Sequence, residues 1–175
     1  MIVGEKILLR PIDMNDINTL FKIHNDIKFK KLAMFHPFPV TFGQDKKWVD
    51  DITSDTSNKS IYFAIEEKGT KLFAGYASLR NINWVNRNCY FGIVIVPDLQ
   101  GKGIGKEATQ LIINYAIKNI NLKKIQLEVI SENQNAIKLY KDSGFIEEGT
   151  LRKQYYFEGF YYDVLLMAYF NKNDI

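Results

Sequence analysis

Residues 91–108 read FGIVIVPDLQGKGIGKEA, and this stretch decides the fold. Its β-branched apolar run ends at Pro97, which has no N–H group with which to continue a strand ladder. Glycines follow at alternate positions, and after them apolar side chains recur at helical spacing: Ala108, Leu111, Ile112, Tyr115 and Ala116. The stretch therefore predicts a strand, a glycine loop and a helix, and the N–H groups of the first helical turn suit an anion such as a phosphate.

The spacing of the glycines separates this loop from two better-known phosphate loops. A Rossmann fingerprint places its third glycine three residues after the second, whereas Gly105 follows Gly103 by two. A P-loop has four residues between its glycines, whereas Gly101 and Gly105 enclose three. The pattern that fits is Gln-x-x-Gly-x-Gly, which begins at Gln100. Taken alone, it is also compatible with a glycine-rich turn that binds no ligand.

A second motif follows a strand predicted at 124–130. Residues 131–145 read SENQNAIKLYKDSGF, in which Ser131 or Asn133 can cap a short helix and Gly144 can end it. One interpretation is purely structural: an amphipathic helix between two strands. As a whole, the segment fits the pattern Asn-x-x-Ala-x-x-Leu-Tyr-x-x-x-Gly-Phe, matched by Asn133, Ala136, Leu139, Tyr140, Gly144 and Phe145.

Together the two motifs resemble the two signatures of the GNAT acetyltransferase superfamily, in the order that the family has. Residues 8–11 (LLRP), 147–152 and 161–167 resemble the branch that contains ribosomal-protein N-terminal acetyltransferases and spermidine acetyltransferases. The resemblance implies a single GNAT domain over residues 1–175 with a mixed α/β fold. Its mostly antiparallel twisted sheet would have about seven strands, including a splayed parallel pair, and about four flanking helices.

The resemblance also implies direct transfer of an acetyl group from acetyl-CoA, the co-substrate, to a primary amine. No set of metal ligands is evident in the sequence, so no metal is expected. The strand backbone at Ile93, Val94 and Ile95 would pair with the pantetheine arm, and Gly92 would keep the parallel pair apart. The pyrophosphate would lie on the loop made by Gln100, Gly101, Lys102, Gly103, Ile104, Gly105 and Lys106. The second motif would add Asn133 and Ala136, although Asn133 can equally serve as a helix cap alone.

Two catalytic residues are expected. Tyr140 matches the family tyrosine that protonates the leaving sulfur, and a phenol with a pKa of ~10 holds its proton at neutral pH. The alternative is that its ring packs beneath the helix and its hydroxyl only orients the thioester. An alkylamine is mostly ammonium at pH 7 and needs a base, yet residues 89–92 (CYFG) carry no carboxylate where many relatives have one. Glu128 on the adjacent strand is the candidate, with His24, His36 and a chain of waters as alternatives.

Composition narrows the class of protein. The chain has 175 residues, of which 46% are hydrophobic and 25% charged, as in ordinary globular domains. The net charge of +3 and the absence of long basic runs give no reason to expect a nucleic-acid partner. No signal peptide and no bilayer-spanning run are visible, so we expect a cytoplasmic protein without a membrane partner. Cys89, the single cysteine, is expected to be a small buried hydrophobe rather than a nucleophile.

The acceptor is less constrained than the donor. Loop 33–40 and the hairpin at 155–162 are expected to form its pocket, and the C-terminal strands can also meet a second subunit in a homodimer. A polyamine or a peptide N-terminus is the expected acceptor, with an amino sugar as an alternative. A polyamine would want several carboxylates, of which Asp50, Asp51, Asp55, Glu147 and Glu148 are available. An alternative of another class is a sensor of the same fold that binds acyl-CoA without turnover.

Overall fold

The computed structural model describes residues 1–171, and in this range eight strands form one sheet in the order β1-β2-β3-β4-β5-β6-β8-β7. The strands are β1 (Ile2–Val3), β2 (Ile7–Arg10), β3 (Ile61–Glu67), β4 (Phe73–Asn83), β5 (Asn88–Ile95), β6 (Lys124–Ile130), β7 (Ile146–Phe157) and β8 (Phe160–Phe170). The α-helices are α1 (Ile17–Asn25), α2 (Ile27–Ala33), α3 (Phe42–Ser54), α4 (Ile104–Lys118) and α5 (Gln134–Asp142). Two short 3₁₀ helices precede α1 and α4, at Met14–Asp16 and Pro97–Leu99.

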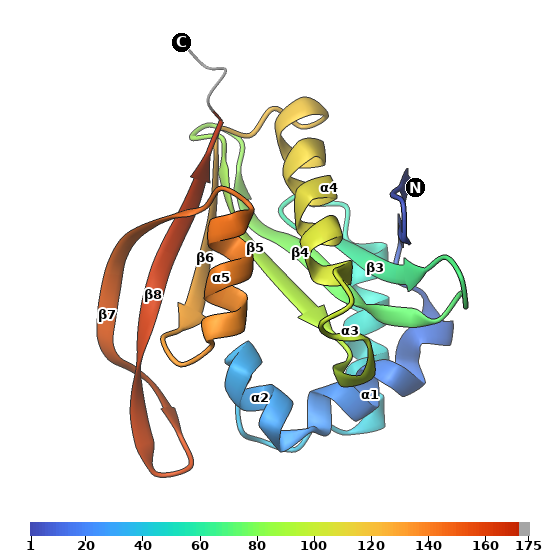
Figure 1. Ribbon diagram of the computed structural model, residues 1–175. Coiled ribbons are helices and arrows are strands. Elements are labelled where there is room, and N and C mark those ends of the chain that lie inside the picture. Colours follow the sequence, from blue (N-terminus) through green and yellow to red (C-terminus); the bar gives the residue numbers. More distant parts are fainter. Residues whose placement is uncertain (172–175) are drawn as a thin grey trace.

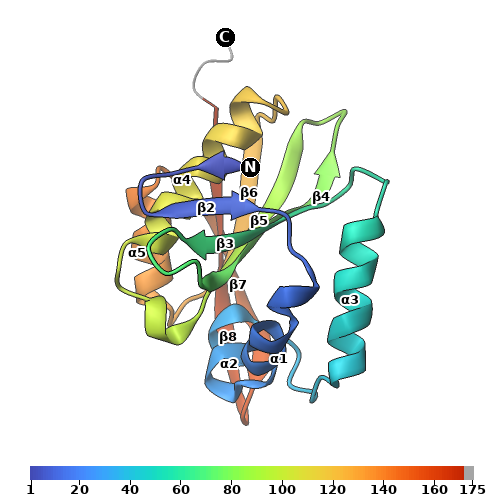
Figure 2. The ribbon, with the colours of Figure 1, turned by 90° about the vertical axis from the view of Figure 1, so that its right-hand side faces the viewer.

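Helices cover both faces of the sheet, with α4 and α5 on one face and α1, α2 and α3 on the other (Figure 1 and Figure 2). Side chains of β5 point to both faces of the sheet and pack against both layers of helices. Cys89 and Phe91 point into the core under α4 and α5, whereas Val94 packs in the smaller core under α1 and α3. β5 is thus apolar on both faces, as expected of a strand in the middle of the sheet.

The parallel pair in the middle of the sheet separates soon after it forms. β5 and β6 are in register only at Asn88↔Lys124, Cys89↔Ile125 and Tyr90↔Gln126. Every other neighbouring pair of strands in the sheet is antiparallel. Beyond Tyr90 the edge of β5 that faces β6 has no strand partner, and Figure 1 shows the two strands diverging toward α2. The splayed pair expected from the resemblance is confirmed.

The structure has one more strand and one more α-helix than expected. The additional helix is α2, whose residues the sequence analysis left without an element. Asp26 accepts a hydrogen bond from the Phe29 N–H and caps its start, and Met34 ends it in the left-handed conformation with φ 53°. The helix signals predicted in the second motif are confirmed, since Asn133 caps α5 and Gly144 has φ +95°. Thr41 and Gln44 form a capping box at the start of α3.

Candidate active site

The turn between β5 and α4 is a cradle of unpaired amides. Gly101 and Gly103 adopt φ of +75° and +84°, and Gly103 is the N-cap of α4. None of the six N–H groups from 101 to 106 donates a hydrogen bond to any described residue. The next amide, of Glu107, donates to the Gly103 carbonyl over 3.1 Å. Because these amides sit at the positive end of a long helix, the cradle suits a pyrophosphate.

Two contacts fix the shape of this loop. The Gln100 side-chain amide donates to the carbonyl of Ile95 over 2.9 Å, which ties the loop back to the end of β5. A Cβ on Gly105 would lie 3.2 Å from Leu139 of α5, so the glycine allows α4 and α5 to approach closely. Of the predicted loop residues, five line the main cleft: Gln100, Gly101, Gly103, Gly105 and Lys106. Lys102 and Ile104 do not line it and contribute only their backbone amides to the cradle.

The main cleft has a volume of about 1230 Å³ and continues from this cradle along the open edge of β5. Ile93, Val94 and Ile95 line it from β5, as predicted for the strand that pairs with pantetheine. Asn133, Ala136 and Tyr140 line it from the start and middle of α5. The Asn133 side chain accepts from the Ala136 N–H over 3.2 Å, so its helix-capping role is visible directly. All the predicted donor-site side chains apart from Lys102 and Ile104 thus meet in one cleft.

Tyr140 is buried among aromatic rings, and its hydroxyl has no hydrogen-bond partner among residues 1–171. Its ring centroid lies 6.3 Å from that of Phe91 and 5.7 Å from that of Phe145. Burial raises the pKa of Tyr140 to about 12, because the apolar surroundings disfavour the phenolate. The cleft therefore contains a protonated phenol whose donor is free.

Cys89 lies outside the cleft, fully buried in the core between β5 and α4. Burial raises the pKa of the Cys89 thiol to about 12. A thiol that is both inaccessible and protonated cannot attack a thioester. The structure therefore leaves no role for Cys89 as an acetyl-carrying nucleophile and agrees with its expected place in the core.

The part of the cleft on the face of α1, α2 and α3 is built around His24. The imidazole Nδ1 is 2.7 Å from Asp45 Oδ1, and Nε2 is 3.2 Å from the Tyr76 hydroxyl. The rings of Phe35, Trp48 and Tyr76 pack edge-on against the imidazole with centroids 5.5 to 5.9 Å away. Both nitrogens of His24 are occupied by these contacts. His24 thus joins α1, α3 and β4 into the wall of the cleft.

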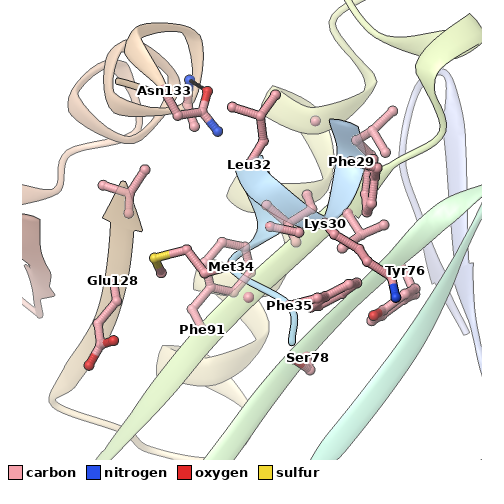
Figure 3. Close-up of a pocket in the computed structure, with 18 of the residues that line it drawn as sticks. Phe29, Lys30, Leu32, Met34, Phe35, Tyr76, Ser78, Phe91, Glu128 and Asn133 are labelled. Carbon is pink, nitrogen blue, oxygen red and sulfur yellow. Dashed lines mark hydrogen bonds between the residues drawn. The ribbon is translucent and has the colours of Figure 1, made fainter. Parts of the chain in front are cut away.

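Few charged groups face this part of the cleft. The carboxylates that line it are Asp45, which is buried against His24, and Glu128, which is exposed on β6. Figure 3 shows Glu128 on β6 across the pocket from Tyr76 and Ser78 on β4. The cations that line the cleft are Lys30, Arg80 and Lys106. Lys30 is buried and donates to the Phe38 carbonyl over 2.5 Å.

The other predicted acidic residues do not gather at the cleft. Asp51 and Asp55 line a separate depression of about 350 Å³ beside α3, and Asp50 is exposed. Glu147 and Glu148 pair with Lys141 and Lys124, at 2.7 and 2.8 Å. The five carboxylates that the sequence offered for a polyamine therefore lie elsewhere on the surface, outside the main cleft. Among residues 1–171, no three His, Cys, Asp or Glu side chains are grouped to hold a metal ion.

The predicted acceptor segments contribute in part. From loop 33–40, the cleft is lined by Ala33, Met34, Phe35, His36 and Val40. From the hairpin, Tyr155 lines it, and its hydroxyl donates to the carbonyls of Lys30 and Phe35 at 3.2 and 3.1 Å. The sequence analysis missed a row of polar side chains on β4. The alternation Tyr76-x-Ser78-x-Arg80 was the signal for this row, since alternate residues of a strand share a face.

None of the helices in residues 1–171 is long and apolar enough to cross a bilayer.

Comparison with known proteins agrees with this geometry. Residues 6–146 match the family described as acetyltransferase (GNAT) domain. The chain is similar to the spermidine N(1)-acetyltransferase of Escherichia coli (strain K12), with 31% identity over 167 residues, which are 95% of this chain and 87% of that protein. It is also similar to a crystal structure of spermidine N-acetyltransferase from Vibrio cholerae in complex with CoA and spermine, with a TM-score of 0.88, 28% identity and coverage of 95% and 96%. A putative ribosomal N-acetyltransferase of Bacillus subtilis (strain 168) is 31% identical over 91 residues, which are 52% of this chain and 50% of that protein. The chain therefore belongs to the GNAT acetyltransferase family and is an acetyl-CoA-dependent N-acetyltransferase.

Proposed function

We propose that the acetyl group passes directly from acetyl-CoA to a primary amine within the main cleft. The observation that carries this proposal is the cradle of six unpaired amides at 101–106, which continues into the open edge of β5. The pyrophosphate of acetyl-CoA would lie on the cradle and its pantetheine arm along Ile93, Val94 and Ile95. The thioester would then lie between β5 and β6, beside Tyr140.

Tyr140 is the proposed hydrogen-bond donor to the sulfur that leaves. Proton transfer from a phenol of pKa about 12 to a thiolate of pKa about 8.5 is uphill by roughly 5 kcal/mol. The phenol therefore acts chiefly by stabilising the thiolate with its hydrogen bond, and the sulfur ends protonated after the amine has lost its proton. The free hydroxyl of Tyr140 supports this role over the alternative of packing alone.

Glu128 is the proposed base. Its carboxylate lines the cleft, is exposed to solvent and has no hydrogen-bond or ion-pair partner among residues 1–171. As the amine nitrogen bonds to the thioester carbon and the carbon–sulfur bond breaks, Glu128 would accept the proton released from nitrogen, directly or through water. His24 is less suited, because Asp45 and Tyr76 already occupy both of its nitrogens.

A primary amine without a second positive charge, such as a peptide N-terminus, fits the cleft better than a polycation does. The buried carboxylate of Asp45 is engaged by His24, and Lys30 and Arg80 line the same wall. A polycation would meet these two cations, whereas Glu128 is the one exposed carboxylate among the described residues that line the cleft. A polyamine such as spermidine is the second candidate. Its support is that this chain is similar, over almost its whole length, to proteins named as spermidine acetyltransferases.

An acceptor panel tests the proposal. Release of the CoA thiol from acetyl-CoA is measured with spermidine, short peptides that have a free N-terminus and an amino-sugar nucleotide. We expect amine-dependent release, with peptides used better than spermidine. If the protein binds acetyl-CoA but releases no CoA thiol with any amine, the result would contradict the proposed transfer and favour a sensor that binds acyl-CoA without turnover.

We also propose that residues 1–175 act as one domain in a cytoplasmic homodimer. Tyr156, Phe160 and Tyr161 on the β7–β8 hairpin are more than half exposed, which supports a contact with a second subunit. The mass measured by light scattering tests this directly. A dimer that dissociates when Phe160 is replaced by Ser is the expected result, and a monomer at micromolar concentration would contradict it.

A further inference from the structure

A gap lies on the acceptor face of the sheet where β5 and β6 begin to separate. Gly92 of β5 pairs with Ser78 of the neighbouring strand β4. A Cβ on Gly92 would lie 3.4 Å from both Ser78 Oγ and Arg80 Nη2. On the other side, Tyr90 pairs with Gln126, so the same register places Glu128 at the level of Gly92. The missing side chain of Gly92 therefore lets the Arg80 guanidinium and the Ser78 hydroxyl lie against the β5 backbone, and both line the cleft, as Glu128 does from β6.

The three polar side chains around this gap have no partners in the fold. Neither Arg80 nor Glu128 makes a hydrogen bond or an ion pair with any of residues 1–171, and the same holds for Ser78 Oγ, although Ser78 is only 3% exposed. Arg10 shows the contrast, since its guanidinium binds Asp16 at 2.8 Å and Glu66 at 2.7 Å. A hydroxyl that reaches the cleft from an otherwise buried residue and has no partner, beside an unpaired guanidinium, indicates a place for a ligand.

We propose that this gap binds a zwitterionic amine, one whose amino group lies within a few bonds of a carboxylate. The carboxylate would accept hydrogen bonds from the Arg80 guanidinium and the Ser78 hydroxyl, and the amino group would face Glu128. This inference rests on the proposed function and names the class of its acceptor: an α- or β-amino acid, free or as the end of a larger molecule.

Arg80 on β4 and Glu128 on β6 carry opposite charges, and together they would select a molecule that has both a carboxylate and an amino group. A guanidinium holds a carboxylate with two parallel hydrogen bonds, which fixes its orientation as well as its position. With the carboxylate held there, the amino group is directed across the missing side chain of Gly92 toward the base. An acceptor with a second ammonium group in place of the carboxylate would meet the like charge of Arg80 instead.

The test compares acceptors that differ only in the carboxylate. Leucine, phenylalanine and β-alanine are each assayed for CoA release beside their carboxamide and their decarboxylated amine. We expect kcat/KM for the best amino acid to exceed that of its carboxamide by at least tenfold. Arg80→Gln should abolish that preference by lowering kcat/KM for the acid about 10- to 100-fold and for the amide less than threefold. Arg152→Gln, an exposed arginine outside the cleft, is the matched control and should leave the preference intact.

A binding measurement keeps the result independent of turnover. The Tyr140→Phe protein saturated with CoA is titrated calorimetrically with the same amino acids, and Arg80→Gln should weaken their binding by a similar factor. Equal losses for acid and amide in both measurements would overturn the inference. Use of spermidine or a carboxamide in preference to every acid would overturn the inference alone, whereas no release with any amine would also contradict the proposed function.

Discussion

At the scale of single residues, burial decides what the titratable groups of the cleft can do. Tyr140 and Cys89 have equally raised pKa values of about 12, but only Tyr140 lines the cleft and has a free hydroxyl. Burial thus keeps the proton on the Tyr140 hydroxyl, the proposed donor for the leaving sulfur, and makes Cys89 an inert part of the core. The sequence analysis already expected Cys89 in the core, and its burial outside the cleft gives the physical reason.

The raised pKa of Tyr140 predicts a loss of stability at alkaline pH. A group whose folded pKa is raised stabilises the protein below its unfolded pKa and loses that contribution as the pH rises toward the folded value. With pKa values of 10.0 unfolded and about 12 folded, Tyr140 should lower the free energy of unfolding by roughly 1 kcal/mol at pH 11 relative to pH 8. Urea unfolding at both pH values checks this.

The Tyr140→Phe protein should lose less stability than the wild type over the same interval. Tyr161→Phe, which removes an exposed phenol, is the control and should behave as the wild type does. An equal alkaline loss in all three proteins would show that Tyr140 is not the group responsible.

The contact between Asp45 and His24 predicts a second effect at this scale. Asp45→Ala would leave His24 Nδ1 buried without its partner at 2.7 Å, and we expect the free energy of unfolding to fall by roughly 2 kcal/mol. Asp50→Ala, at an exposed position of the same helix, should change stability by less than about 0.5 kcal/mol. Similar losses in the two variants would contradict a structural role for the pair.

At the scale of elements, caps and glycines were predictable because they depend on local chemistry. Thr41, Asn133 and Gly144 act as their sequence context predicts. The helix α2 was missed because it is short and lies in a lysine-rich segment with weak periodicity. The row Tyr76, Ser78 and Arg80 was missed because a polar face on a central strand has meaning only once the neighbouring strands are known.

Asn133 allows the helix cap to be separated from a contact with the donor. Asn133→Ala should lower stability by about 1 kcal/mol, because it removes the acceptor of the Ala136 N–H. Asn133→Ser restores a cap and should recover most of that loss. If the acetyl-CoA Kd rises in both variants, measured by calorimetry, Asn133 also holds the donor. A stability equal to wild type in Asn133→Ala would contradict the cap.

Gly105 tests the close approach of α4 and α5. A Cβ there would lie 3.2 Å from Leu139 and 3.6 Å from Ile95, so Gly105→Ala should shift the cradle. We expect the Kd for acetyl-CoA to rise roughly tenfold, about 1.4 kcal/mol. Gly43→Ala on α3, where nothing lies within 4 Å, is the control and should leave the Kd unchanged. A Kd that is equal in both variants would mean that the loop tolerates displacement.

At the scale of the whole molecule, two motifs that are distant in sequence meet because β5 and β6 pair only briefly. The sequence indicates each motif and its order, but the cleft depends on where the strands part and on α1, α2 and α3 covering the other face (Figure 2). The side chains predicted for the donor site, apart from Lys102 and Ile104, lie together in this cleft. The acceptor wall comes from α1, α2, α3, β4, β6 and the hairpin, and no single local pattern describes it.

The most direct test of the central claim separates donor binding from chemistry at Tyr140. CoA release is measured with the best acceptor of the panel, and acetyl-CoA binding is measured by calorimetry, for wild type and Tyr140→Phe. We predict that Tyr140→Phe lowers kcat about 100-fold, within the range for removal of one acid or oxyanion donor, while the Kd changes less than twofold. Unchanged kcat, or a loss explained wholly by weaker acetyl-CoA binding, would contradict the account.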